Sequence, residues 1–376
     1  MLDILNEAIQ SSPNKEITYE QYMNLVLYHE EKGYYMKDKE KVGKEGDFIT
    51  SSNISDVFGK LFATIFHKLI SLEKIPPFIC EIGGGNGRFA KAVLDELKDT
   101  FYDTYEKITY LIIETSPFHR QLQQELLPIG KKVIQYESLD EVKKDLSVYG
   151  GILFSNELFD AFPVRVIEKK KGKLFEVKIT INKDKQLTEV LSPLSDEKII
   201  GYLTSNHIKL TDEQRFEVPL QMLSYLNEIN QFVGNAVLFT VDYGYTNEEW
   251  QEPGRRKGSL RGYYKHQLMN NSLERPGEMD LTTHIHFDTL ISHGSKIGLE
   301  FVKKLRQDEF LLAAGILSFL QENVDTNPFS EKSKQNRAIR SLIMDGGMST
   351  AFHVVIQQKD VNIKWEKVLT LISRMY

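Results

Sequence analysis

The residues best placed to do chemistry are a carboxylate and a group of glycines behind a short apolar segment. The segment ends at Glu81, and a helical pattern opens behind the glycines at Gly83, Gly84, Gly85 and Gly87. Glycine accepts positive φ angles and lets a ligand approach the bare backbone. The free N–H groups of the following helix point into the same crevice. Because the carboxylate would repel a pyrophosphate, a ligand with a cationic amino-acid head suits this turn better.

The spacing of the glycines separates two kinds of turn. The dinucleotide fingerprint G-x-G-x-x-G requires a third glycine, but Arg88 or Ala90 stands there, depending on the starting glycine. The observed pattern is E-x-G-x-G-x-G, which resembles that of class I methyltransferases. Their ligand, S-adenosylmethionine, has a cationic amino-acid head. A glycine turn without a ligand is the alternative.

Two more acidic residues follow later strands of the predicted sheet. Ligands of a doubly wound sheet bind at the carboxyl ends of its strands. Glu114 ends one strand, and we expect it to accept both ribose hydroxyls. Asp140 follows the next, and with the backbone of Leu139 it is expected to reach the adenine amino group. Each carboxylate alone could be a helix cap.

The fourth predicted strand leads into the residues that we expect to face the reacting group. Methyl displacement requires a lone pair close to the carbon and a desolvated site. A carboxylate could orient an amine or guanidinium and accept its proton. We therefore predict Asn156, Glu157 and Asp160 as catalytic residues, with Asn156 also near the cofactor. Asn156 could instead cap the next helix.

Strands and helices alternate around these residues, which predicts an α/β fold with a doubly wound parallel sheet covered on both faces. The expected strands are 78–82, 108–114, 132–136, 150–155, 236–241, 298–305 and 351–358. The expected helices are 18–32, 54–74, 88–98, 117–126 and a buried one at 310–320. We expect an N-terminal helical and lid region at 1–76 and a Rossmann-like core at 77–165 and 233–376.

An insertion at 166–232 interrupts this core. Alternating segments at 164–168 and 174–181 predict a β-hairpin, and 212–232 is expected to be helical. The polar segment 245–285 is too long for a simple loop and predicts a functional substrate wall.

The bulk composition excludes several functions. The 376 residues carry a net charge of −6 and a single cysteine, Cys80, so no intrachain disulfide can form. We expect a cytoplasmic protein that does not bind nucleic acid through bulk charge. No apolar run reaches the roughly 20 residues that span a bilayer. A homodimer is conceivable.

A metal site is a further hypothesis from the sequence. His284 and His286 alternate onto one strand face near Asp280. Methyl transfer needs no metal, and no further ligand cluster is apparent. We therefore expect no metal, and a structural or substrate contact for His284.

Longer strings give a more specific resemblance over about residues 20–358. They are G-D-F-I-T-S at 46–51, N-E-L-F-D-A-F-P-V at 156–164, D-Y-G at 242–244, L-R-G-Y at 260–263 and D-L-T-T-H at 280–284. With the glycine motif, they resemble the MidA family of class I methyltransferases. Mitochondrial members of that family act as complex I assembly factors and protein arginine methyltransferases.

The resemblance implies S-adenosylmethionine as the cofactor and a protein side chain, arginine, as the substrate. Residues 46–51 could fold over the cofactor, with Thr50 and Ser51 as hydrogen-bond donors, and Arg261 could contact the substrate. Methylation of a small molecule and a non-catalytic assembly factor that binds the cofactor remain alternatives. An open acidic groove would favour a cationic peptide, whereas a closed apolar pocket would favour a small molecule.

Overall fold

The computed structural model describes residues 1–38, 56–322, 327, 329–344 and 350–369. The expected lid at 46–51, with Thr50 and Ser51, therefore lies outside the described residues. No helix among the described residues is long and apolar enough to cross a membrane.

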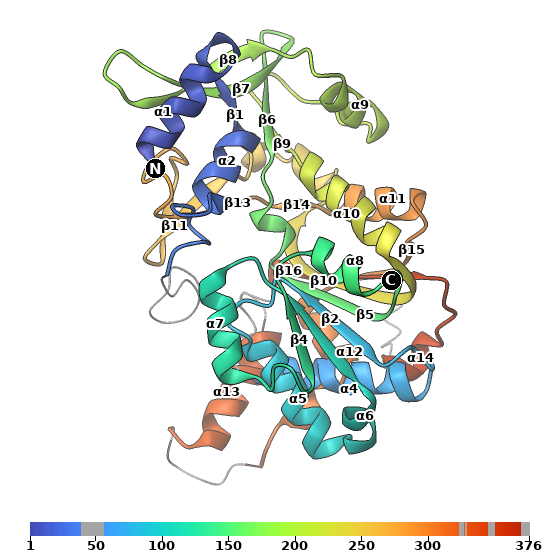
Figure 1. Ribbon diagram of the computed structural model, residues 1–376. Coiled ribbons are helices and arrows are strands. Elements are labelled where there is room, and N and C mark those ends of the chain that lie inside the picture. The colour runs from blue at the N-terminus through green and yellow to red at the C-terminus, as the bar shows by residue number, and fades with distance from the viewer. Residues whose placement is uncertain (39–55, 323–326, 328, 345–349, 370–376) are drawn as a thin grey trace.

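The centre of the molecule is a mostly parallel sheet (Figure 1). Its strands, in chain order, are β2 (Phe78–Ile82), β3 (Thr109–Ile113), β4 (Val133–Tyr136), β5 (Tyr149–Asn156), β10 (Val233–Tyr245), β15 (Glu300–Arg306) and β16 (Phe352–Lys359). Their spatial order is β15-β16-β10-β5-β2-β3-β4, and β14 (Ile285–His286) pairs with the end of β10. β16 runs antiparallel to both of its neighbours.

The order of the strands creates a crevice beside the glycine turn. The chain runs outward from β2 through β3 to β4 and then returns to place β5 on the other side of β2. Connections on the two sides of this point diverge, so the carboxyl ends of β2 and β5 border a ligand site in folds of this kind. The predicted doubly wound α/β class is confirmed.

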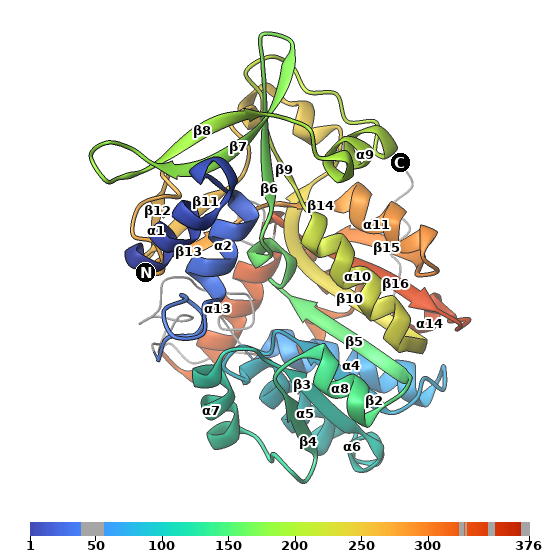
Figure 2. The ribbon, with the colours of Figure 1, turned by 45° about the horizontal axis from the view of Figure 1, so that its top comes forward.

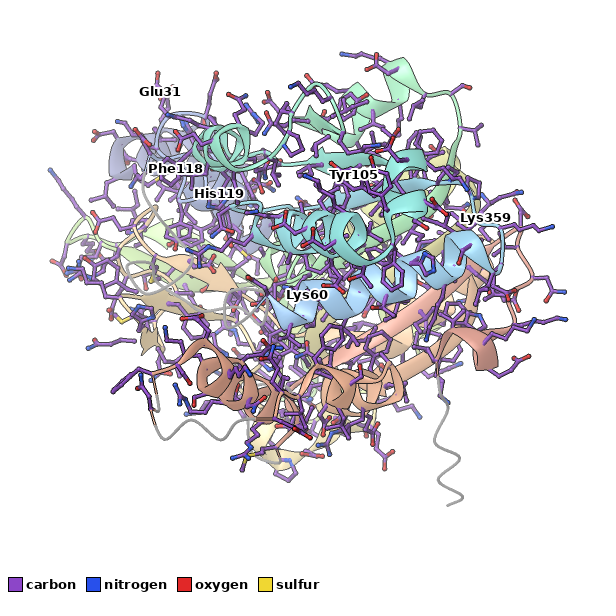
Figure 3. All side chains as sticks on the ribbon, turned by 90° about the horizontal axis from the view of Figure 1, so that it is seen from below. Glu31, Lys60, Tyr105, Phe118, His119 and Lys359 are labelled. Atoms are coloured by element: carbon purple, nitrogen blue, oxygen red, sulfur yellow. The ribbon has the colours of Figure 1, made fainter. Side chains whose placement is uncertain are left out.

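Helices cover both faces of this sheet because its strands are apolar on both sides. One face packs against α4 (Val57–Ser71), α5 (Arg88–Thr100), α12 (Gln307–Ala313), α13 (Glu331–Ile343) and α14 (Trp365–Val368). The other face packs against α8 (Leu139–Asp145), α10 (Leu220–Phe232) and α11 (Phe287–Lys296). The helices α6 (Tyr102–Lys107) and α7 (Pro117–Leu126) complete the core. Seen from below, α4 lies between α5 and α13, with Lys60 near its start (Figure 3).

Side chains on β5 show how alternation builds the two cores. Phe154 faces the α4 side, where its ring stacks on Phe89 at 4.1 Å between centroids and meets Phe62 edge-on. Its neighbour Leu153 points to the opposite face and joins the cluster around α10. Successive residues of a strand point to opposite faces, so one apolar run anchors helices on both sides.

A smaller antiparallel sheet stands above the core (Figure 2). It contains β1 (Ile17–Thr18), β6 (Arg165–Lys170), β7 (Lys173–Ile181), β8 (Leu187–Pro193) and β9 (Arg215–Val218). The N-terminal helices α1 (Leu2–Ser11) and α2 (Tyr19–Tyr28) cover one face, and α9 (Glu197–Ser205) covers the other. The N-terminal segment and the insertion therefore form one packed unit.

The segment 245–285 is folded rather than a plain loop. Two short 3₁₀ turns, Glu249–Gln251 and Pro253–Arg255, precede a three-stranded sheet of β11 (Arg261–Tyr264), β12 (Gln267–Met269) and β13 (Asp280–Thr282). Met279 and Leu281 pack into the same cluster as α2. This sheet therefore links the N-terminal helices to the mouth of the main sheet.

Two of the expected helices are wrong in part. The range 212–232 contains the strand β9 before α10 begins, because Pro219 interrupts the chain between them. The expected helix at 310–320 ends at Ala313, and Gly315, with φ at +94°, leads into a 3₁₀ turn at Ile316–Phe319. The domain boundaries proposed from the sequence stay a prediction.

Candidate active site

A cavity of about 940 Å³ lies at the carboxyl ends of β2 and β5. Its walls come from the glycine turn, the loop after β5, the start of α10, and the segment around β11 and β13. Residues of α2 and of the chain just behind it close one side. The main sheet and the N-terminal segment thus both contribute residues to one site.

The glycine turn is held rigidly at the cavity wall. Gly85 has φ at +52°, its N–H donates to Glu114 Oε2 at 2.7 Å, and its carbonyl accepts from Gln123 Nε2 at 2.6 Å. A Cβ atom at Gly85 would meet no atom within 4 Å. Gly83 also lines the cavity, whereas Gly87 caps the start of α5 and does not line it. Open space therefore lies against the bare backbone at Gly85.

Glu114 braces this turn from the next strand. Its Oε1 accepts the N–H of Ser116 at 2.8 Å while its Oε2 accepts that of Gly85. The carboxylate lines the cavity. Each of its oxygens has a second lone pair, so the predicted role toward two hydroxyl groups stays compatible with this position.

Glu81 is a buried carboxyl beneath the turn. It lines the cavity and accepts a hydrogen bond of 2.8 Å from the Tyr110 hydroxyl at Oε2. Burial raises the pKa of Glu81 to about 8. A cationic group in the cavity would favour the ionised carboxylate.

Asp140 does not reach the cavity, contrary to the sequence prediction. Its side chain is 78% exposed and pairs with Lys143 at 3.2 Å within the first turns of α8. Leu139 and Ser138 do line the cavity. Because Ser138 caps α8, Asp140 is the second residue of this helix, and its side chain points to solvent.

The loop after β5 places the predicted catalytic residues together. Asn156 Nδ2 donates to Glu157 Oε1 at 3.1 Å, and both side chains line the cavity with Asp160. Asn156 Oδ1 is buried and has no hydrogen-bond partner among the described residues. Asn156 makes no side-chain cap on the following turn, which begins behind Leu158. An unpaired amide oxygen buried at the wall of this cavity makes Asn156 a candidate ligand contact.

Burial and mutual repulsion raise the pKa values of the acidic residues in this loop. Desolvation, followed by the nearby Asp160, raises the pKa of Glu157 well above its usual value. Desolvation raises the pKa of Asp160 to about 6, although the Tyr243 hydroxyl donates to its Oδ2. Perturbed acids of this kind cluster at functional sites.

Sequence reasoning missed Asp242, which organises this loop from β10. It is fully buried, its Oδ2 accepts the N–H of Phe159 at 3.1 Å, and its Oδ1 accepts that of Tyr243 at 2.9 Å. Burial, followed by repulsion from Asp160, raises its pKa well above the usual value. The D-Y-G string marked this position without indicating its contacts.

Tyr28, Tyr35 and Asp280 also line the cavity and were not predicted as site residues. The Tyr35 hydroxyl donates to Asp280 Oδ1 at 2.7 Å, and the Tyr28 hydroxyl donates to the carbonyl of Ala161 at 2.9 Å. The D-L-T-T-H string and the metal-site hypothesis had drawn attention to Asp280, and nothing in the sequence pointed to the tyrosines.

The two histidines of this region have different surroundings. His284 lines the cavity with Arg261 and stacks on Tyr245 at 4.4 Å. Burial lowers the pKa of His284 to about 3, so its imidazole is neutral. His286 does not line the cavity, and its Nδ1 lies 2.7 Å from the Tyr202 hydroxyl. Within the described ranges no cluster of three His, Cys, Asp or Glu residues could hold a metal.

The shape and the polar groups of the cavity fit S-adenosylmethionine. The open space at Gly85, the unpaired Asn156 Oδ1 and the buried Glu81 carboxyl offer shape, an acceptor and a partner for a cation. With the sheet order and the glycine turn at its switch point, they define a class I methyltransferase.

Residues 58–304 match a family model described as "Putative S-adenosyl-L-methionine-dependent methyltransferase". The chain belongs to this family, and it is an S-adenosylmethionine-dependent methyltransferase. The likeness extends to a crystal structure from Burkholderia thailandensis, bound to S-adenosyl-homocysteine, with a TM-score of 0.86 at 23% identity. That superposition covers 96% of this chain and 92% of the other, and it shows the same fold.

Curated relatives are named protein arginine methyltransferase NDUFAF7, or its homolog, mitochondrial. The Caenorhabditis elegans protein is 27% identical over 77% of this chain and 72% of its own length. The Xenopus tropicalis protein is 28% identical over 72% of this chain and 66% of its own length, just under two thirds. Both names place these relatives in mitochondria, which contradicts the expectation of a cytoplasmic protein, and that expectation is withdrawn.

Proposed function

We propose that this protein transfers a methyl group from S-adenosylmethionine to an arginine side chain of a protein. The observation that carries the proposal is the charge of the cavity. Of the described residues that line it, one, Arg261, is a permanent cation, and six are acidic: Glu81, Glu114, Glu157, Asp160, Glu228 and Asp280. Glu81 and Glu114 belong to the proposed cofactor end, and the other four acids favour a cationic substrate. The names of the relatives support a protein arginine as that substrate.

The glycine turn and the strand ends support a cofactor site at one end of the cavity. Gly83, Gly85 and Leu139 would supply shape, Glu81 and Glu114 carboxylates, and Asn156 an amide oxygen. Gly87 would contribute indirectly, because its backbone shapes the glycine turn at the start of α5. The cofactor, when bound, supplies a methyl group on a sulfonium, which an incoming lone pair can accept. Roles for Thr50 and Ser51 stay a prediction.

The loop after β5 would serve the nucleophile. A guanidinium nitrogen that gains a methyl group must lose one of its protons. Glu157, oriented by the Asn156 amide, would hold the guanidinium and take this proton at a carboxylate oxygen. Asp160, fixed by Tyr243, would share the positive charge. Asp160 is buried, whereas Glu157 is half-buried at the wall of the cavity.

Labelled methyl transfer tests this proposal. The protein and S-adenosylmethionine with a labelled methyl group are incubated with an extract, and the protein fraction is hydrolysed to amino acids. We expect labelled methylarginine from the wild type, at least a hundredfold less from Glu157→Gln, and a normal yield from the exposed control Glu278→Gln. Label in lysine or in small molecules, or no label despite normal cofactor binding, would refute the proposal.

A further inference from the structure

We propose that Asp280, positioned by Tyr35, determines specificity for the guanidinium group by forming a two-carboxylate subsite with Glu157. This inference rests on the proposed function and deepens it, because it assigns recognition of the substrate to a residue outside the cofactor site. It also gives the N-terminal segment a part in substrate selection.

A backbone hydrogen bond ties the strand that carries Asp280 to the loop after β5. Asp280 opens β13, is 2% exposed and lines the cavity, and its strand pairs with β11 so that it lies opposite Tyr263. Three residues further on, the Thr283 N–H donates to the carbonyl of Asp160 at 2.8 Å. The register of β13 is thus tied to the same loop that carries Glu157.

The N-terminal segment fixes the other side of Asp280. The rings of Tyr28 and Tyr35 stack at 5.4 Å with 19° between their planes, and their hydroxyls bond Ala161 and Asp280 respectively. The two tyrosines therefore connect α2 and the chain that follows it to the loop after β5 and to β13. Aromatic faces beside carboxylates suit a flat, delocalised cation, and a guanidinium can bond two carboxylates in its plane.

The charges around Asp280 support the same ligand. Glu157, Asp160 and Asp242 lie on the core side, and repulsion from Asp280 contributes to the raised pKa of Glu157. Burial, followed by Asp280, raises the pKa values of Tyr28 and Tyr35 far above the usual value, so both hydroxyls stay protonated. His284 is neutral, and Arg261 is the permanent cation among the described residues that line the cavity.

A bound guanidinium would therefore change the protonation of this cluster. Its charge is permanent, because a guanidinium does not lose its proton at the pH values at which proteins are folded. It favours ionised carboxylates, so a proton held by the cluster leaves on binding. A neutral side chain of the same shape would release none. Proton release and arginine selectivity are thus two readouts of one subsite.

Calorimetry with matched peptides tests the subsite in the full-length protein saturated with S-adenosylhomocysteine. The probes are acetyl-Gly-Arg-Gly-amide and the same peptide with citrulline, measured at pH 7 in two buffers of different ionisation enthalpy. We expect the arginine peptide alone to bind, with a net release of protons. Asp280→Asn should weaken its binding at least tenfold and Tyr35→Phe about threefold, while Glu278→Gln leaves it unchanged.

Several outcomes would overturn the inference. They are equal binding of the two peptides, no binding of either, no proton release, or wild-type affinity in Asp280→Asn. Affinity for S-adenosylhomocysteine must stay within about twofold in each variant, and Tyr35→Phe provides the test if Asp280→Asn fails to fold. Labelled methylarginine made by Asp280→Asn at the normal rate would refute this subsite and leave the proposed function intact. Methyllysine from the wild type would refute the proposed function itself.

Discussion

Replacing Gly85 by alanine should separate the cavity from the stability of the turn. Gly85 has φ at +52° and open space where a Cβ would lie. A residue other than glycine in this backbone region costs roughly 1–2 kcal/mol. The turn cannot easily retreat, because hydrogen bonds of 2.7 and 2.6 Å hold Gly85 on both sides. The added methyl group must therefore take space from the ligand.

Gly130 offers a matched control. It also has a positive φ, +78°, and an added Cβ would likewise meet no atom within 4 Å. It does not line the cavity. Gly85→Ala and Gly130→Ala should thus lose similar stability, roughly 1–2 kcal/mol each. Only Gly85→Ala should lose cofactor affinity, by at least about tenfold or 1.4 kcal/mol.

Urea unfolding gives the stability of both variants, and calorimetric titration with S-adenosylmethionine gives the affinity. Gly85→Val should abolish measurable binding because it fills more of the same space. If Gly85→Ala binds the cofactor as tightly as the wild type, the ligand does not approach this backbone. If Gly130→Ala loses affinity equally, the loss reflects the fold rather than the cavity.

Three further changes test a buried acid of the cavity, the support of the chain before β11 and the exposed acid of α8. Glu81→Gln should make the free energy of unfolding depend less on pH. Because the pKa of Glu81 is raised in the folded protein, its contribution to stability is complete below pH 4.5 and is lost as the pH rises toward 8. Between pH 5.5 and 7.5, urea unfolding should therefore show that the wild type loses about 2 kcal/mol more than the variant. Glu217→Ala should lower the free energy of unfolding by about 2–4 kcal/mol, because the buried donors of Ser259 and Leu260 lose their acceptor; wild-type stability in urea would contradict those contacts. Asp140→Asn should leave cofactor affinity within about twofold, since its side chain is exposed, and a tenfold loss by calorimetry would restore the role expected from the sequence.

The parts of the site predicted from the sequence are those that local rules determine. The glycine turn and the loop after β5 follow adjacent parallel strands, and the carboxyl ends of such strands meet at one edge of the sheet. Gly85, Glu114 and Glu157 could therefore be assigned to one crevice from spacing alone. The structure places all three on the cavity wall.

Other positions depended on information that spacing does not contain. The exposed side chain of Asp140 is one example, because the cap at Ser138 sets which way the first turn of α8 faces. The contact between Tyr35 and Asp280 joins residues 245 positions apart and depends on how the N-terminal unit packs on β13. No local pattern reports such packing.

The acidic cavity itself argues for cationic ligands at both ends. Burying several carboxyl groups together is unfavourable, and the protein keeps them by raising their pKa values and surrounding them with donors such as Tyr110, Tyr243 and Tyr35. Apolar residues of similar size would stabilise the fold more, as replacements of buried charges often do. A methyl donor carries a positive sulfonium and amino group, and an arginine substrate carries a positive guanidinium. Each cation would offset part of the repulsion among these acids, so each of the two ligands gains binding free energy from the acidic lining.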